Sequence, residues 1–490
     1  MAIRAVAADL KPCPMLIGSE HRLSKGRTEV QHSPASGEPL ALIPYCTPEE
    51  ISEAIATAQQ AFPGWSSTPV IQRARVMFRY RQLLEQHADE LAALITEEHG
   101  KTHEEAKGSL QRGIECVEFA AGIPSLMMGE SVARVSGDVD TASVREPIGV
   151  CVGITPFNFP LMVPLWMFPI AIACGNTFVL KPSDRVPRSA VRAAELLYEA
   201  GLPAGVINVV HGAKAAVDAL LTDSRVKAVS FVGSSPVAKY IYTTAAANGK
   251  RVQAMGGAKN HSVVMPDCNL TPAVESIMSS SFGCAGERCV ATSVVVAVGE
   301  VGDKLVDELR RAADAMRVKP GDQPGCDMGP VITPEARERI IGYIEAGEQE
   351  GAKLVRDGRK DSVCQGDGNF LGATIFDHVR PQMRIAREEI FGPVLSVIRA
   401  RDLEEALAVV NGSEHGNAAS IYTRSGEAAK RFASDVKTGM VGVNLGVPAP
   451  VAIFPFSGWK NSFFGDAHAL GKDAVRFYTE TKVITSRWPE

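Results

Sequence analysis

The chain has 490 residues, of which 45% are hydrophobic and 22% charged, and its formal net charge at pH 7 is −5. This length exceeds one ordinary domain and predicts about two to four structural units, and the composition is that of a globular protein. The small net charge gives no electrostatic reason to expect a nucleic acid or an anionic membrane surface as a partner.

The cellular location is predicted from two features. The first residues, MAIRAVAADLKPCPMLIG, lack the apolar core and cleavage site of a signal peptide, and the longest apolar run, residues 160–175, is too short for a membrane span and contains three prolines. The ten cysteines form no CxxC pair and no metal-binding spacing. We therefore expect a cytoplasmic protein with reduced thiols and no membrane partner; a mitochondrial matrix location stays open if a transit peptide has been removed.

In chain order, residues 59–98 are helical in character, with apolar residues at helical spacing. From Gly149 short apolar runs alternate with helical stretches: GVCVGIT, TFVLK, VINVV, AVSFVG and RVQAM. This alternation predicts βαβ units in a parallel sheet. A second α/β region begins near Asn260. The C-terminal FYTETKVITSRW alternates like a strand, and a strand that comes so late favours oligomer formation.

The segment FGCAGERCVA, residues 282–291, holds a candidate nucleophile. Small residues surround Cys289, which lets a ligand approach the backbone. A thiolate attacks carbonyl carbons well when its pKa is lowered, and the adjacent Arg288 is expected to lower it. The alternative is that Cys289 is simply a small buried hydrophobic residue.

Polar residues that follow two predicted strands are candidates for further roles. In ITPFNFP, Asn158 offers a side-chain amide that suits an oxyanion, and an Asn in a turn is the alternative, favoured when the residue is taken alone. In TFVLKPSD, Lys181 ends a strand and Asp184 follows; this pair suits the hydroxyls of a ribose, and a solvated turn is the alternative.

Two further segments carry weaker signals. In FVGSS, Gly233 and Ser234 stand where a strand gives way to a helix, a position that suits a pyrophosphate, but the chain has no GxGxxG motif there. EEIFGPV, residues 388–394, is a turn with two acids before an apolar strand. Its composition alone indicates no function.

In this order and at these spacings, PFNFP, LKPS, FVGS, the cysteine segment and EEIFGP resemble the aldehyde dehydrogenase superfamily, over nearly the whole chain. The resemblance implies an α/β fold with a Rossmann-type NAD-binding domain, an α/β catalytic domain and a small β oligomerisation element. The expected boundaries are residues 1–124 and 148–256, residues 257–455, and residues 125–147 with 470–490, respectively. A homo-oligomer, either a dimer or a tetramer, is expected.

The same resemblance implies roles for single residues. Cys289 matches the nucleophile and Asn158 the oxyanion donor. The positions that match cofactor contacts are Thr155, Pro156, Phe157, Lys181, Asp184, Gly233, Ser234, Glu389 and Phe391. An acid at Asp184 would bind a ribose 2′-hydroxyl and repel a 2′-phosphate, so NAD is expected rather than NADP. No metal site is expected.

The chain departs from the family pattern at two positions. Hydrolytic members carry a glutamate that activates water, and in RVQAMGGAKNH the matching position is Met255, which has no basic group. The last glycine of the family's cofactor turn is Ala238, which weakens the pyrophosphate assignment. Without the glutamate, release of the acyl group calls for another nucleophile, and a thiol that arrives as its thiolate needs less help.

Several segments, among them QRGIECVEFAAG and FGCAGERC, resemble the CoA-acylating methylmalonate-semialdehyde dehydrogenases of this superfamily. In that subgroup two arginines hold the substrate carboxylate, and the matching positions are Arg112 and Arg288. The tail departs from the subgroup at residues 458–460, which puts substrate preference in doubt.

The resemblance implies oxidation of malonate or methylmalonate semialdehyde to acetyl-CoA or propionyl-CoA with NAD, with CoA as co-substrate and with loss of CO2. One alternative is a hydrolytic NAD-dependent dehydrogenase for another small aldehyde. A non-catalytic binding protein is an alternative from a different class, against which the joint presence of Cys289, Asn158, Lys181 and Glu389 argues.

Overall fold

The computed structural model describes residues 10–488. Its largest sheet has eight strands in the order β2-β1-β9-β8-β7-β10-β11-β21. The bounds of these strands are β1 Met15–Ile17, β2 Glu20–Arg22, β7 Val150–Ile154, β8 Thr177–Lys181, β9 Ile207–Val209, β10 Val226–Val232, β11 Arg251–Met255 and β21 Phe463–Gly465. The five central strands are parallel and nearly all buried, as expected of strands covered on both faces.

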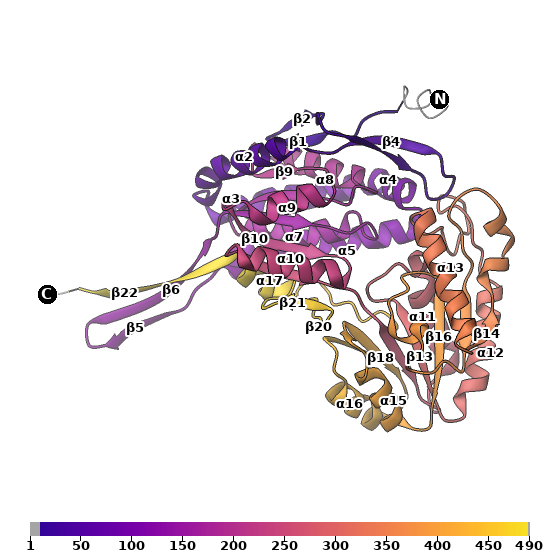
Figure 1. Ribbon diagram of the computed structural model, residues 1–490. Helices are drawn as coiled ribbons and strands as arrows, with labels where there is room; N and C mark the ends of the chain where they lie inside the picture. Colours follow the sequence, from indigo (N-terminus) through magenta and orange to yellow (C-terminus); the bar gives the residue numbers. More distant parts are fainter. Residues whose placement is uncertain (1–9, 489–490) are drawn as a thin grey trace.

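Helices cover this sheet (Figure 1). Their bounds are α2 Pro48–Ser66, α3 Val70–Gln86, α4 Ala88–His99, α5 His103–Ala121, α6 Ile123–Leu126, α7 Met162–Ala173, α8 Arg188–Glu199, α9 Lys214–Thr222, α10 Ser235–Ala247 and α17 Gly471–Phe477. The helical stretch predicted over residues 59–98 is thus three consecutive helices. Capping boxes start α2 and α5, where Thr47 and Thr102 each exchange hydrogen bonds with a glutamate three residues later.

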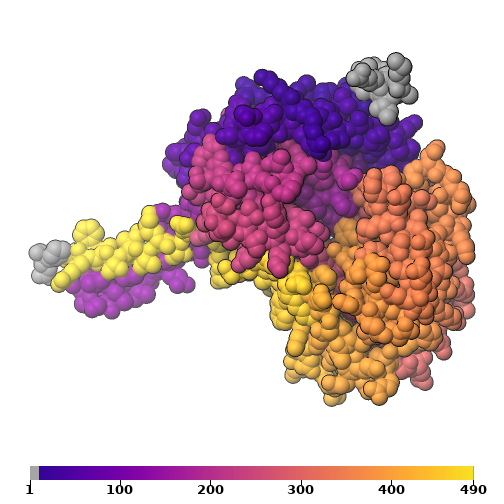
Figure 2. Space-filling model, in the orientation of Figure 1, coloured from indigo at the N-terminus to yellow at the C-terminus, as the bar shows by residue number. Residues whose placement is uncertain are grey.

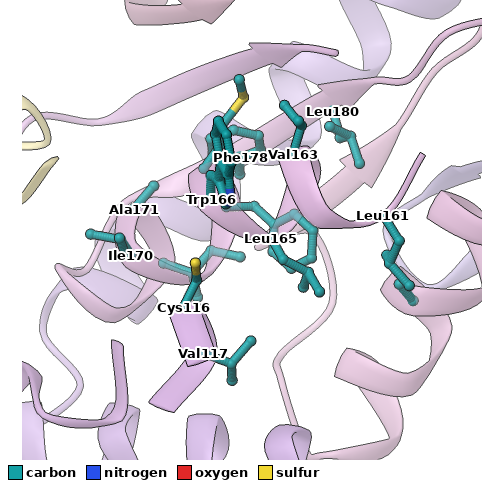
Figure 3. Packing of buried hydrophobic residues seen from close by; sticks show 14 of the residues in the cluster. Cys116, Val117, Leu161, Val163, Leu165, Trp166, Ile170, Ala171, Phe178 and Leu180 are labelled. Carbon is teal, nitrogen blue, oxygen red and sulfur yellow. The ribbon is translucent and has the colours of Figure 1, made fainter. Parts of the chain in front are cut away.

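The apolar run over residues 160–175 forms helix α7, which is apolar on every side and buried in the first core. Figure 3 shows Leu165 and Trp166 of α7 packed with Cys116 and Val117 of α5. This packing explains why so apolar a segment belongs to the protein interior. Within residues 10–488 no helix is both long and apolar enough to cross a membrane.

A second sheet has seven strands in the order β14-β15-β16-β13-β12-β18-β19, and all neighbours but β14 and β15 are parallel. The strand bounds are β12 Asn260–Val264, β13 Thr292–Val298, β14 Lys353–Arg356, β15 Thr374–Asp377, β16 Val394–Ala400, β18 Ala418–Tyr422 and β19 Met440–Val443. The helices of this region are α11 Leu270–Phe282, α12 Val301–Asp314, α13 Pro334–Gln349, α14 Arg384–Arg387, α15 Leu403–Asn411 and α16 Gly426–Asp435, with 3-10 turns η1 Gly283–Gly286, η2 Gly358–Lys360 and η3 Ser362–Gln365. This unit has its own core of buried residues.

A third sheet forms an arm that stands clear of the rest of the molecule (Figures 1 and 2). It contains β5 Ser131–Ser136, β6 Val139–Pro147 and β22 Thr479–Arg487, and β22 pairs antiparallel with β6 over its full length. Apolar side chains on the arm, such as Val132 and Val483, are exposed. Two small sheets, β3 Thr28–His32 with β4 Pro39–Pro44 and β17 His415–Gly416 with β20 Trp459–Lys460, complete the fold.

The C-terminal part of the chain returns to elements formed much earlier. Strand β21 extends the first sheet beside β11, and β22 pairs with β6. The strand predicted in FYTETKVITSRW is confirmed from Thr479 onward, whereas its first two residues end helix α17. The sequence predicts no signal peptide at the start of the chain. Residues 1–9 of that segment lie outside the described residues.

Candidate active site

A cavity of about 230 Å³ lies where the first core meets the loops of the second sheet. Its polar lining includes Cys289, Cys284, Glu105, Arg112 and Arg288. Its apolar wall is formed by Phe159, Met162, Trp166, Val447, Phe456 and Leu470, among others. A mostly apolar cavity with a few converging polar groups is the usual form of a small-molecule site. The structure therefore brings the predicted nucleophile and both predicted arginines to one cavity.

Cys289 stands in the loop between η1 and β13, and its backbone carbonyl accepts hydrogen bonds from the side-chain amides of Asn260 (2.9 Å) and Asn417 (2.7 Å). Burial raises the pKa of its thiol to about 12, and the carboxylate of Glu389 acts in the same direction. Arg288 does lower the pKa of this thiol, as expected, but the effect of burial is larger. The net direction is therefore upward and is set by burial rather than by Arg288.

The turn before Cys289 has an uncommon backbone. Cys284 and Ala285 both have φ of 51°, in the left-handed region that residues with a Cβ rarely adopt. The next residue, Gly286, has φ of 74°, and a Cβ there would lie 2.2 Å from the carbonyl oxygen of Gly392. Such strain persists only where neighbours hold the backbone, and here the N–H of Cys284 donates to Glu105 Oε1 at 2.7 Å.

Asn158 follows β7 and is buried beside the nucleophile segment. Its Nδ2 donates to the carbonyl oxygen of Glu287 at 2.8 Å, two residues before Cys289. The backbone carbonyl oxygen of Asn158 accepts a hydrogen bond from Nζ of Lys101 at 2.6 Å. One N–H of the Asn158 amide is thus used by the protein, and the second remains for a ligand.

The two arginines of the cavity come from distant segments of the chain. Arg112 on α5 pairs with Glu115 (2.8 Å) and donates to the carbonyl of Pro450 (2.9 Å). Arg288 pairs with Glu105 (2.8 Å). Each guanidinium has five N–H donors, so these contacts leave donors for a ligand carboxylate.

Three predicted cofactor positions lie at one edge of the first sheet. These positions are at or just after the carboxyl ends of three adjacent parallel strands: Thr155 follows β7, Lys181 ends β8 and Gly233 follows β10. Helix α10 begins directly after Ser234, which makes no side-chain capping bond to the described residues. Ligands of α/β sheets bind outside the carboxyl ends of the strands, with phosphates at a helix N-terminus.

Two expected ribose contacts are engaged within the protein. Lys181 is buried, and its Nζ donates to the carbonyls of Gly212 (2.7 Å) and Pro182 (2.9 Å); burial lowers its pKa. Asp184 accepts a hydrogen bond from the hydroxyl of Tyr45. A ribose hydroxyl would therefore share Asp184 with Tyr45.

Four further cofactor candidates come from two segments: Pro156 and Phe157 directly after β7, and Glu389 and Phe391 shortly before β16. Glu389 accepts from the N–H of Ala258 at 2.8 Å, and burial raises the pKa of its carboxyl to about 6. The ring of Phe391 meets that of Phe157 edge to face, with centroids 5.9 Å apart. Phe157 also stacks on His99, and Pro156 beside it is partly exposed. Aromatic walls next to a carboxylate fit a flat ring attached to a sugar.

The model of the aldehyde dehydrogenase family matches residues 22–484. The chain belongs to this family. It is 58% identical over 465 residues to a malonate-semialdehyde dehydrogenase of Geobacillus kaustophilus (strain HTA426), which covers 95% of this chain and 96% of the relative. It is similar to the crystal structure of methylmalonate-semialdehyde dehydrogenase from Oceanimonas doudoroffii, with a TM-score of 0.97, 52% identity and 98% and 99% of the two chains covered.

A further aldehyde dehydrogenase structure resembles this one closely. It is a Sinorhizobium meliloti 1021 protein named as a methylmalonate-semialdehyde dehydrogenase and solved in complex with NAD, with a TM-score of 0.97, 47% identity and 99% of each chain covered. The predicted superfamily and its α/β fold are confirmed.

Three polar residues beside the nucleophile escaped the sequence analysis. Glu105 is the last residue of the capping box of α5, and the sequence THEE reveals that box. The sequence does not reveal that Glu105 also contacts residues 284 and 288. Glu287 is fully buried, which raises the pKa of its carboxyl to about 8. Lys101 is buried against the ring of Phe159. No sequence signal reveals that these side chains converge.

Residues 10–488 contain no group of three or more His, Cys, Asp or Glu side chains placed to hold a metal ion. The ten cysteines, all within this range, are free. The polar side chains around the cavity are those of nucleophilic and acid–base chemistry.

Proposed function

We propose that the chain oxidises malonate or methylmalonate semialdehyde with NAD and transfers the acyl group to CoA, giving acetyl-CoA or propionyl-CoA and CO2. The observation that carries this proposal is the placing of Arg112 and Arg288 in the cavity of Cys289. A guanidinium matches a carboxylate through paired hydrogen bonds, so a cavity with two of them favours an aldehyde that also bears a carboxylate. The relatives named for these semialdehydes support the same substrates.

The proposed cofactor fits the edge of the first sheet. The hydroxyl of Thr155 is buried and has no hydrogen-bond partner among the described residues. The first turn of α10 offers the backbone N–H groups of Ser235 and Val237, since Pro236 has none and that of Ala238 donates to the carbonyl of Ser234. We assign the pyrophosphate to Gly233 and Ser234, the riboses to Lys181, Asp184 and Glu389, and the nicotinamide wall to the aromatic residues with Thr155 and Pro156. When bound, NAD accepts the hydride of the aldehyde.

In the proposed mechanism the Cys289 thiol loses its proton to solvent and the thiolate attacks the aldehyde carbon, while the amide of Asn158 donates to the resulting alkoxide. Loss of hydride then leaves a thioester on Cys289. The substrate carboxylate lies β to the thioester carbonyl, which accepts the electrons of the breaking C–C bond as CO2 departs. The two arginines orient the carboxylate before reaction, which places the aldehyde carbon next to the sulfur.

The residue at the position of the hydrolytic base supports transfer to CoA. Met255 ends β11, is 3% exposed, and belongs to the apolar cluster against which Cys289 packs. A thioether has no basic group to deprotonate water. A thiolate from CoA needs no such base to displace Cys289 from the acyl group.

The test is product analysis with malonate semialdehyde and NAD, with and without CoA. We expect one fast burst of NADH without CoA, followed by near arrest with an acyl group on Cys289, and steady formation of acetyl-CoA once CoA is added. Equal steady rates with and without CoA, with free acid as product, would show a hydrolytic enzyme. A wild-type enzyme that prefers propanal outright would refute the semialdehyde assignment.

We further propose that the chain is a homo-oligomer, a dimer or a tetramer, assembled through the arm. Exposed apolar side chains on β5 and β22 support this, because an isolated sheet with such a surface gains stability when covered. We propose domain boundaries at residues 1–124 and 148–256, residues 257–455, and residues 125–147 with 470–490. Sedimentation of the chain with and without residues 479–490 tests the assembly through the arm.

The free cysteines suit a reducing compartment, and we propose the cytoplasm as the location of the protein.

A further inference from the structure

The carboxylate of Glu105 joins three parts of the site. Its Oε1 accepts from the N–H of Cys284 at 2.7 Å and from Nη2 of Arg288 at 2.8 Å. Its Oε2 accepts from the N–H of Thr102 at 3.1 Å, which completes the capping box of α5. The ion pair is sheltered, since the side chains of Arg288 and Glu105 are 17% and 16% exposed.

Arg288 is held on two more sides. Its Nη1 donates to the carbonyl oxygen of Ser279 at 3.3 Å. Its guanidinium lies flat against Gly283, where a Cβ would stand 2.5 Å from Cζ, Nη1 and Nη2 alike. The position of this long side chain is therefore fixed before any ligand arrives.

We propose that Glu105 is a positioning residue that sets the specificity of the site for aldehydes bearing a carboxylate, by holding Arg288 in its recognition geometry. This inference rests on the proposed function. Glu105 stands two helical turns before Arg112 on α5, so the same helix fixes both guanidinium groups relative to each other. It touches no reacting atom in this proposal and acts through Arg288.

The physical reason is preorganisation. An arginine side chain loses much rotamer freedom when it is fixed, and a substrate that must fix it gives up that part of its binding energy. A neutral hydrogen bond is about half as strong as one between ions, so an amide in place of the carboxylate holds the guanidinium less firmly. The loss of binding energy therefore affects only substrates whose carboxylate binds Arg288.

The test compares Glu105→Gln and Glu105→Met in the full-length protein. Gln keeps an acceptor for the N–H of Cys284 and for the helix cap, whereas Met removes it. The readout is the ratio of kcat/KM for malonate semialdehyde to kcat/KM for propanal, which lacks the carboxylate. We expect the ratio to fall about fivefold in the Gln variant and about tenfold or more in the Met variant. Glu104→Gln is the control, because Glu104 is an exposed acid in the same first turn.

A second readout does not require oxidation of the semialdehyde. Malonate, which carries the carboxylate but no aldehyde, should inhibit propanal oxidation competitively, and its inhibition constant should rise by the same factors. If both aldehydes lose the same factor, if the ratio rises, or if malonate inhibits all variants alike, Glu105 does not position Arg288. A wild-type enzyme that rejects the semialdehyde refutes the proposed function, while the malonate series still decides the role of Glu105.

Discussion

Replacing Gly283 by alanine adds a single methyl group and tests whether Arg288 recognises the substrate carboxylate. The backbone of Gly283 has φ of −57° and ψ of 141°, which alanine adopts without strain. The added Cβ would lie 2.5 Å from three guanidinium atoms of Arg288, whereas nonbonded carbon atoms rest at about 3.5 Å. The guanidinium must therefore retreat by about 1 Å.

A retreat of that size breaks the contacts that hold Arg288. The bond to Glu105 is 2.8 Å long and that to Ser279 is 3.3 Å, so both would exceed hydrogen-bonding distance. A hydrogen bond to a charged group contributes about 1.5–3 kcal/mol, and each 1.36 kcal/mol is about tenfold in rate. We expect kcat/KM for malonate semialdehyde to fall roughly 10- to 150-fold, and that for propanal less than about threefold.

The assay follows NADH with both aldehydes at saturating NAD and CoA. Gly342→Ala is the matched control, since Gly342 lies in α13 with nothing within 4 Å of its added Cβ. The melting temperature of Gly283→Ala should fall, because the folded protein loses contacts of a sheltered side chain, so the comparison of the two aldehydes is the readout of recognition. If Gly283→Ala lowers kcat/KM for the two aldehydes equally, or for neither, Arg288 does not recognise the carboxylate.

Four more outcomes follow from the site. Cys289→Ala should abolish NADH formation while the dissociation constant of NAD, measured by calorimetry, changes less than about twofold; persisting turnover excludes the thioester. Asn158→Ala should lower kcat about 100- to 1000-fold where chemistry limits turnover, and an unchanged kcat would speak against the oxyanion role. Arg112→Leu should reduce kcat/KM for the semialdehyde far more than for propanal, and equal losses would make Arg112 structural. Because burial raises the pKa of the Cys289 thiol to about 12, its alkylation by iodoacetamide without NAD should accelerate about tenfold per pH unit between about pH 7 and 9; a plateau in that range contradicts the raised pKa.

The elements that the sequence predicts are those whose signal is local. The parallel strands β7, β8 and β10 are short apolar runs bounded by glycine or polar residues, and each was recognisable from about seven residues. The site residues were assigned from the resemblance to a family, and that resemblance rests on the order and spacing of the motifs. Cys289 and Arg288 thus share a cavity with Arg112, as expected.

What the sequence could not predict depends on contacts between distant segments. Glu105 and Arg288 are separated by 183 residues, and Tyr45 and Asp184 by 139. The net pKa of Cys289 is a related case: the adjacent arginine that lowers it is visible in the sequence, whereas the burial that outweighs the arginine is produced by packing.

The pairing of the arm's strands is delayed during synthesis of this protein. Thr141 of β6 and Thr485 of its partner β22 lie 344 residues apart, and a ribosome adds about 5–20 residues per second. Strand β6 therefore waits about 20 to 70 s for its partner in each round of translation. Throughout that interval its edge is open to other nascent chains emerging from the same message. The residues between 447 and 456 that line the cavity, together with Leu470, also emerge late, so the cavity is completed only as translation ends.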